Sequence, residues 1–590
     1  MGQNIRISKM QKYITSAVFF AVIYWIYGFV RPEWCNFHEQ YQMFLFGWDY
    51  LTDHLSVASG MADYAAEFVV QFFFFPKLGA AFWAGLLLLM GFLVYKVSRV
   101  LAPGSGDGHF ALALLPSLLM EIYCGNQNVM LAFPVSLICA LALLLLYNRL
   151  GVRWRIYVQI VAIPLIYWLI GYGVFLYALL AAFMDYRRFY GRVWQLTAIT
   201  AAYAILSVMS VVICGYTVMR QYPFIDLYCG INFYRERLII PDMQHWVTAA
   251  TAVSALGLGF LPSCGKVLAI VETALVSMAA PLLLPFSHDG DTYTMLKIDY
   301  LVRNQQWEDV IDVCAHTSNL DEMGYTGLNL ALAKTNQLAD RMFCWPQCGQ
   351  NGLISIFKRN MVSCTISAEA CYHLGLINTV LRLYYDSQEA ILNCNKSARF
   401  SHRIAEAFLI NGDYDVAAKY IRQLKRTLFY SGWAVEAESC LYHPDQVMGN
   451  KRWASIIRRR IPEDVLYSVT DMSDMLLMLH RQSPDNQLAL QYAMACDLLT
   501  GNLDHFMKYF PITQGGRTNM AEFRNVPKAY QEAIAYKLIQ QNGLDKGLPP
   551  FITQDVAADL RDFDRFLLQS TGQMPQGRLY ATYWRYILSQ

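Results

Sequence analysis

Hydrophobic residues are distributed unevenly along this chain. Between Tyr13 and Phe286, long apolar stretches alternate with short charged loops, whereas from Ser287 onward polar and charged residues recur at ordinary density. An apolar run of about 20 residues is long enough to cross the hydrocarbon core of a bilayer. The pattern therefore predicts a transmembrane helical domain over residues 1–286 and a soluble helical domain over residues 287–590.

Nine apolar segments are candidates for membrane-spanning helices. They are residues 13–30, 79–95, 110–123, 129–147, 156–170, 172–184, 194–214, 246–262 and 267–286. Several are shorter than the roughly 20 residues that a straight span needs, and a short helix at membrane depth must be buried against other protein. We therefore expect an all-α fold that begins with a polytopic bundle of about nine spans.

Basic residues set the expected orientation of this bundle. Lysines and arginines gather near the N-terminus and in four connections, at residues 96–99, 149–155, 187–192 and 266. Short loops rich in lysine and arginine stay in the cytoplasm. We expect residues 31–78 and 215–245 to form outward loops. An odd number of spans then places the C-terminal domain outside the cytoplasm.

Composition narrows the possible classes of function. With 16% charged residues and a formal net charge of +2, the chain lacks the basic surface that nucleic-acid binding requires. Among its fourteen cysteines, Cys344 and Cys348 lack a second pair at zinc-site spacing, so no metal site is predicted there and a disulfide stays open. The sequence contains no Walker loop, which argues against an ATP-driven pump.

The first outward loop carries acids at helical spacing. Asp49 and Asp53 are four residues apart, and Asp63, Glu67 and Gln71 repeat this spacing within an aromatic and aliphatic segment. Such residues share one face of a helix, and a polar stripe opposite aromatic residues is typical of the membrane interface. A partly desolvated carboxyl there has the raised pKa that a general base needs. The alternative is an amphipathic helix whose acids face water.

The second outward loop supplies cations, and two further acids lie inside expected spans. Arg220, Arg235 and Arg237 are candidates to bind a lipid phosphate as bidentate donors, with pairing to the acids or interface anchoring as alternatives. Glu121 and Glu272 lie at depths where ionisable groups usually face the bundle interior, in packing or in function.

The soluble half contains helix-pair signals. In residues 403–424, Ala405, Gly412, Tyr414 and Ala417 stand at the small-aromatic-small spacing of tetratricopeptide helix pairs. Weaker copies lie near residues 305–314, 336–343 and 501–510. Their irregular spacing predicts a degenerate α-solenoid of tetratricopeptide-like pairs, which presents a concave face to a protein partner.

Two resemblances follow from these features. The acid-bearing loop after a first span, and the bundle of uneven spans, resemble the GT-C superfamily of membrane glycosyltransferases. That resemblance implies a polyprenyl-phosphate-linked sugar donor and a loop acid that acts as base or binds a divalent metal ion. The phrase GMADYAAEFVVQFFFFPKLGAAF at residues 60–82 resembles an uncharacterised family of Bacteroidota membrane proteins, which implies no activity. Together with the expected orientation, we expect a protein of the bacterial inner membrane whose C-terminal domain lies in the periplasm. The chain departs from GT-C proteins in having fewer spans and no adjacent acid pair early in the loop.

We therefore expect an envelope protein that transfers sugar from a lipid-linked donor. The candidate catalytic residues are Asp63 and Glu67, followed by Asp49 and Asp53. The alternative is a non-catalytic membrane-anchored scaffold whose helical repeats recruit envelope partners. A transporter is the third hypothesis.

Overall fold

The computed structural model describes most of the chain. The described residues are 2–102, 109–127, 129–150, 155–189, 193–230, 241–262, 265–287, 290–355, 361–391, 395–461, 468, 470–517, 519–542, 547–568 and 576–590. The regular structure in these ranges is helical throughout, as predicted. The helices divide into two compact units. Unit 1 comprises Met1–Tyr293, Ile391–Arg399 and Arg422–Ala434, and unit 2 comprises Thr294–Ala390, Phe400–Ile421 and Val435–Gln590.

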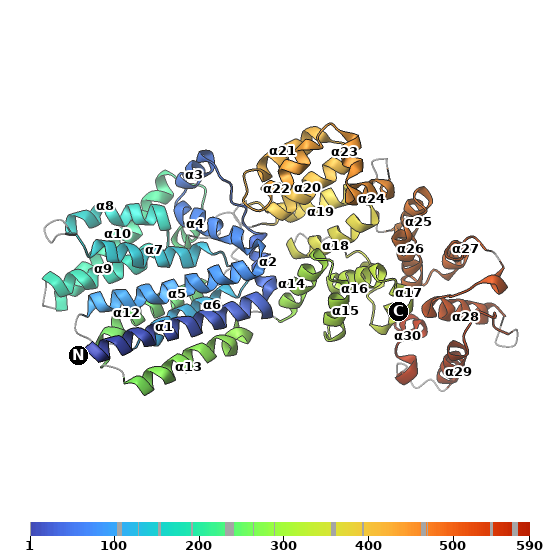
Figure 1. The fold of residues 1–590 in the computed structure, drawn as a ribbon, viewed down its shortest axis with the longest axis horizontal. Coiled ribbons are helices and arrows are strands. Elements are labelled where there is room, and N and C mark those ends of the chain that lie inside the picture. The colour runs from blue at the N-terminus through green and yellow to red at the C-terminus, as the bar shows by residue number, and fades with distance from the viewer. Residues whose placement is uncertain are drawn as a thin grey trace. The chain divides into compact units, whose positions relative to one another are not determined.

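Unit 1 is built on long apolar helices. Within the described residues, four helical stretches are long and apolar enough to cross a membrane: Met10–Val30, Pro76–Leu101, Val193–Thr217 and Lys266–Phe286. They belong to α1 (Gly2–Trp25), α5 (Pro76–Leu101), α10 (Val193–Thr217) and α13 (Lys266–Leu283), and α1 packs against both α5 and α13 (Figure 1). These helices indicate that the chain associates with a membrane.

Among the described residues, only four of the nine predicted spans are long enough for a straight crossing. The other apolar helices of unit 1 are α6 (Leu115–Cys124), α7 (Ala132–Tyr147), α8 (Arg155–Ile170), α9 (Gly173–Phe189) and α12 (Pro241–Gly257). The longest of these has 17 residues. At 1.5 Å per residue, such a helix falls short of the roughly 30 Å hydrocarbon core. The break predicted between α8 and α9 is confirmed, and Gly171 adopts φ +63° there.

Residues 31–78, which the sequence predicts to be the first outward loop, are largely helical. It contains α2 (Pro32–Glu39), α3 (Trp48–Leu55), α4 (Gly60–Val70) and the short 3₁₀ turn η2 (Gln71–Phe74). Pro32 and Pro76 each stand in the first turn of a helix, where the missing N–H has no intrahelical partner to lose. In unit 1, α4 packs against α7 and α8, so the loop lies against the bundle.

The second half of the chain forms shorter helices. They are α14 (Gly290–Arg303), α15 (Trp307–Ala315), α16 (Glu322–Lys334), α17 (Leu338–Arg341), α18 (Met361–Leu374), α19 (Ile377–Glu389), α20 (Ala398–Asn411), α21 (Tyr414–Leu424), α22 (Ser431–Ser439), α23 (Pro444–Gly449), α24 (Lys451–Arg459), α25 (Met472–Gln482), α26 (Gln487–Leu499), α27 (Leu503–Thr513), α28 (Lys528–Asn542), α29 (Gln554–Leu568) and α30 (Tyr583–Leu588). The best predicted pair is present as α20 and α21, with Ala405 and Ala417 fully buried and Gly412 at φ +87° in the turn. The degenerate α-solenoid stays a prediction.

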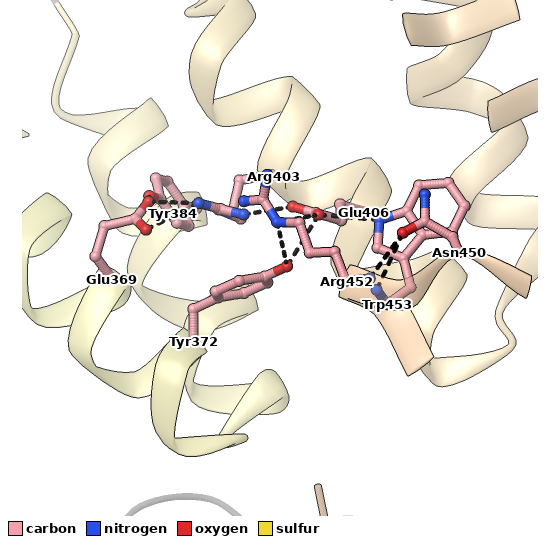
Figure 2. A network of polar contacts seen from close by, with 8 residues as sticks. All are labelled: Glu369, Tyr372, Tyr384, Arg403, Glu406, Asn450, Arg452 and Trp453. Atoms are coloured by element: carbon pink, nitrogen blue, oxygen red, sulfur yellow. Dashed lines mark hydrogen bonds and ion pairs between the residues drawn. The ribbon is translucent and has the colours of Figure 1, made fainter. Parts of the chain in front are cut away.

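The core of unit 2 contains a buried ionic network (Figure 2). The Arg403 guanidinium on α20 donates to both carboxylate oxygens of Glu369 on α18, each at 2.8 Å, and also to Glu406. Arg452 on α24 lies 3.5 Å from Glu406, and the Trp453 indole donates to the same carboxylate at 3.0 Å. Two arginines therefore balance two glutamates, which is the condition under which buried charges are tolerated.

Candidate functional site in the first outward loop

The turn between α3 and α4 brings their side chains together. A Cβ at Gly60 would lie 1.7 Å from the His54 carbonyl oxygen, so α4 begins in contact with the end of α3. The turn is tied to α8 by two hydrogen bonds. Ser59 N donates to the Trp168 carbonyl at 2.8 Å, and Trp168 Nε1 donates to the Leu55 carbonyl at 3.0 Å. The geometry of the loop is thus fixed by the helix bundle beneath it.

Glu67 is the buried centre of a polar cluster formed by Tyr50, His54, Asp63 and Glu67. The Tyr50 hydroxyl donates to Glu67 Oε2, and His54 Nε2 lies 3.0 Å from the same oxygen. His54 Nδ1 lies 2.8 Å from the Tyr50 carbonyl, which can only accept. Both imidazole nitrogens therefore face acceptors, an arrangement that favours the charged imidazolium.

The electrostatics of His54 agree with this geometry. Burial by itself would lower the pKa of His54, but the hydrogen bond and negative charge of Glu67 outweigh it, and the pKa is raised above its ordinary value. His54 and Glu67 thus form an ion pair within the loop.

Asp63 lies one helical turn before Glu67 and is half-buried. Burial and repulsion from Glu67 raise the pKa of Asp63 to about 7, while the charge of His54 opposes the rise. A carboxyl with a pKa near neutrality exchanges a proton readily, which is the property of a general acid or base. The cluster can therefore hold one mobile proton on Asp63 beside a fixed ion pair.

The other two predicted acids are not drawn into this cluster. Asp49 accepts a hydrogen bond of 2.6 Å from Arg426 Nη2, and its side chain is 65% exposed. The hydrogen bond from Arg426 lowers the pKa of Asp49, so it stays charged. Asp53 is exposed to solvent, and the structure does not bring it to Glu67. Asp63 and Glu67 are the pair that the fold brings together.

Three residues of this region were not identified as site residues from the sequence: Tyr50, His54 and Arg426. Tyr50 and His54 are four residues apart, so a search for hydrogen-bonding partners at helical spacing would have found them. Arg426 lies 377 residues from Asp49 along the chain, and no local signal joins them. Phe429 and Tyr430 are likewise far along the chain from the unit 1 residues that they contact. The ring of Phe429, for example, stacks on that of Phe74, with centroids 5.5 Å apart.

The predicted phosphate-binding arginines are only partly described. Arg220 is exposed, and its Nε donates to the Tyr216 carbonyl at 2.6 Å. Arg235 and Arg237 lie outside the described residues. In the part of the chain that the structure describes, no three histidine, cysteine, aspartate or glutamate side chains gather as metal ligands. The described cysteines, including Cys344 and Cys348, are free thiols.

The two acids inside apolar helices differ. Glu272 on α13 lies 2.7 Å from His109 Nδ1, and His109 Nε2 lies 2.8 Å from the Pro262 carbonyl, which favours a packing role. Glu121 on α6 is 2% exposed, and neither of its carboxylate oxygens has a hydrogen-bond partner among the described residues.

Comparison with known proteins gives one match. A family described as a family of unknown function, DUF6057, matches residues 7–590. No curated protein and no solved structure matches.

Proposed function

The protein belongs to the family of unknown function DUF6057, and from its own geometry we propose that it is a membrane-bound transferase that uses Asp63 as general base. The observation that carries this proposal is the polar cluster: Asp63 lies one helical turn before the buried Glu67, which Tyr50 and His54 contact. Burial and Glu67 raise the pKa of Asp63 to about 7. General-base catalysis is most effective when the pKa of the base lies near the working pH. The ion pair between His54 and Glu67 holds the neighbouring charge fixed while Asp63 changes its protonation state.

The proposed substrate is a sugar linked to a lipid through phosphate, as the GT-C resemblance implies. Asp63 takes the proton of an acceptor hydroxyl, the hydroxyl oxygen bonds to the anomeric carbon, and the bond from that carbon to the lipid phosphate breaks. The phosphate leaves with the electron pair. Arg220, Arg235 and Arg237 are proposed to bind that phosphate.

We propose in addition a number of spans and an orientation for the membrane domain. The shorter apolar helices complete a GT-C-like bundle of about nine spans in the bacterial inner membrane. The first outward loop and the helical repeats then lie in the periplasm. A reporter that is active only in the cytoplasm, fused after Gln590, is expected to be silent, and a strong signal contradicts this orientation.

A membrane-anchored scaffold is the second candidate function. It is favoured by the mutual hydrogen bonding of Tyr50, His54 and Glu67, because a satisfied buried cluster also serves to hold a loop in shape. In that case the helical repeats recruit envelope partners, and no proton transfer is needed at Asp63.

Asp63→Asn in a deletion strain separates the two functions. The amide keeps the shape of the side chain and removes the base, so the transferase proposal expects a loss of about 10²–10⁴-fold in rate. The readout is the profile of lipid-linked glycans, and Asp53→Asn is the matched control, because Asp53 is exposed and lies outside the cluster. Full complementation by Asp63→Asn at normal protein level overturns the transferase and favours the scaffold.

A further inference from the structure

Unit 2 contains a polar cleft at the ends of three helices. Its volume is about 300 Å³, and it lies where α25 and α27 begin and α26 ends. Nine of its eleven lining residues carry a hydroxyl, amide, carboxylate or imidazole group, and the other two are Met472 and Cys496. Most small-molecule pockets are mainly apolar, so this composition selects against an apolar ligand.

A buried relay fixes one wall of the cleft. Asp497, whose side chain is 1% exposed, accepts a hydrogen bond of 2.7 Å from Ser473 Oγ. Both carboxylate oxygens of Asp497 lie 2.9 Å from His505 Nδ1, so Nδ1 carries the hydrogen. The imidazole ring is therefore held in one orientation, with Nε2 on its opposite side.

His505 Nε2 and Asp474 form the accessible polar pair of the cleft. Asp474 Oδ1 lies 3.3 Å from His505 Nε2, a long contact, and the Asp474 side chain is 75% exposed. A ligand hydroxyl beside this pair can exchange hydrogen bonds with both groups, since a hydroxyl both donates and accepts. Thr470, Thr500 and Asn502 supply further hydrogen-bond donors and acceptors in the same cleft.

The cleft is acidic, because Asp471, Asp474 and Asp497 stand against the single imidazole of His505. Asp497 faces His505, while Asp471 and Asp474 stand at the start of α25, where the partial positive charge of the helix terminus favours them. Such a site disfavours an anionic ligand. A neutral ligand with several hydroxyl groups can donate hydrogen bonds to these carboxylates and accept them from the hydroxyl and amide groups of the lining.

We propose that this cleft binds a neutral polyhydroxylated molecule of the size of one sugar residue. Ligand pockets range over about 300–1,000 Å³, and this cleft is at the lower limit, which suits a single ring. The inference rests on unit 2 alone and does not depend on catalysis in the first outward loop. It assigns the soluble part of the protein a site for a saccharide.

Calorimetric titration of the full-length protein in lipid nanodiscs tests the inference. The probes are glucose, galactose and N-acetylglucosamine, with the dication putrescine and the apolar alcohol cyclohexanol for comparison. At least one sugar is expected to bind saturably. His505→Gln and Asp474→Asn are each expected to weaken it by about 10-fold or more, since a hydrogen bond to a charged group contributes about 1.5–3 kcal/mol.

Asp504→Asn is the matched control variant. Asp504 lies beside His505 on α27, is 81% exposed and pairs with Lys537 at 2.8 Å, but it does not line the cleft. The control is expected to bind sugar like the unmodified protein. The proposal is overturned if no sugar binds saturably, if the two cleft variants bind like the control, or if putrescine or cyclohexanol binds more tightly than every sugar. Asp474→Asn alters an exposed side chain, so a folding defect does not obscure its result.

Discussion

Asp63 sits between two charges of opposite sign, and this position makes its pKa adjustable in both directions. Burial raises that pKa most, Glu67 raises it further by repulsion, and His54 lowers it by attraction. We predict that Glu67→Gln lowers the pKa of Asp63 from about 7, because the repulsion is lost, and that His54→Gln raises it. The pH dependence of the Asp63 carboxyl stretch in infrared spectra, assigned with Asp63→Asn, measures the shift.

Opposite shifts in the two variants are the critical result. A general loosening of the loop would expose Asp63 to water and lower its pKa in both variants alike. Shifts of the same sign would therefore mean that hydration, rather than the charges of His54 and Glu67, sets the protonation of Asp63.

The shared helix face of Asp63 and Glu67 could be predicted from the sequence because their relation is local. Residues four apart on a helix share a face wherever the helix is placed, so the stripe could be predicted without knowing the fold. The partner of Asp49 could not be found in this way. Arg426 is brought to it only by long-range packing, and a single chain carries no pattern that pairs residues 377 positions apart.

At the scale of helices and turns, the closest backbone contact of the candidate site is at Gly60, between α3 and α4. A methyl group there would meet the His54 carbonyl, which belongs to backbone and cannot rotate away. We predict that Gly60→Ala destabilises unit 1 by about 1–3 kcal/mol, as overpacking does elsewhere. Gly85→Ala is the control, since nothing lies within 4 Å of its Cβ position on α5. Hydrogen exchange in α3 and α4 measures the loss, and equal protection in both variants would contradict this packing.

The ionic network of Figure 2 couples helices α18, α20 and α24. We predict that Arg403→Met destabilises unit 2 by about 3–5 kcal/mol, because Glu369 and Glu406 then lose their buried countercharge. The control is Arg382→Met, which removes an exposed pair with Asp386 and is expected to cost less than about 1 kcal/mol. Denaturant dependence of hydrogen exchange in α18 compares the two variants, and similar losses would argue against a buried network.

The same network gives unit 2 a defined response to acid. Burial alone would raise the pKa of Glu406, but Arg403 and Arg452 outweigh it and hold the pKa at about 2, against 4.5 ordinarily. A lowered carboxyl pKa stabilises the fold above the ordinary value and loses that contribution as pH falls toward the folded value. The protection of α20 should therefore decline between about pH 4.5 and pH 2.

Element lengths show where sequence patterns stop being informative. All the expected apolar segments in unit 1 that the structure describes are helical, but hydropathy does not fix where a helix ends. The break at Gly171, with φ +63°, was predicted from the sequence, but the α8 and α9 that it separates are each below the length of a straight span. The helix pair at Gly412 was predictable because glycine marks its turn directly.

For the whole molecule, the division into units does not follow chain order. Arg422–Ala434 belongs to unit 1, where Phe429 stacks on Phe74 and the Tyr430 hydroxyl donates to Glu39 at 3.0 Å. We predict that Phe429→Ala makes this segment sensitive to protease in the folded protein, because each aromatic pair contributes about 0.5–1.5 kcal/mol. Leu428→Ala is the control, since Leu428 is exposed. Equal digestion of the two variants would mean that the ring contacts do not hold the segment.

Because Arg422–Ala434 packs within unit 1, that unit can be completed only late in translation. The ribosome finishes the long apolar helices early, but Phe72 and Phe74 receive Phe429 only after residue 429 has been synthesised. Until then the nascent chain displays an aromatic surface that its own later sequence will cover. A message truncated before that codon is expected to yield an unfinished unit 1, with the exposed apolar surface that quality-control proteases and chaperones recognise.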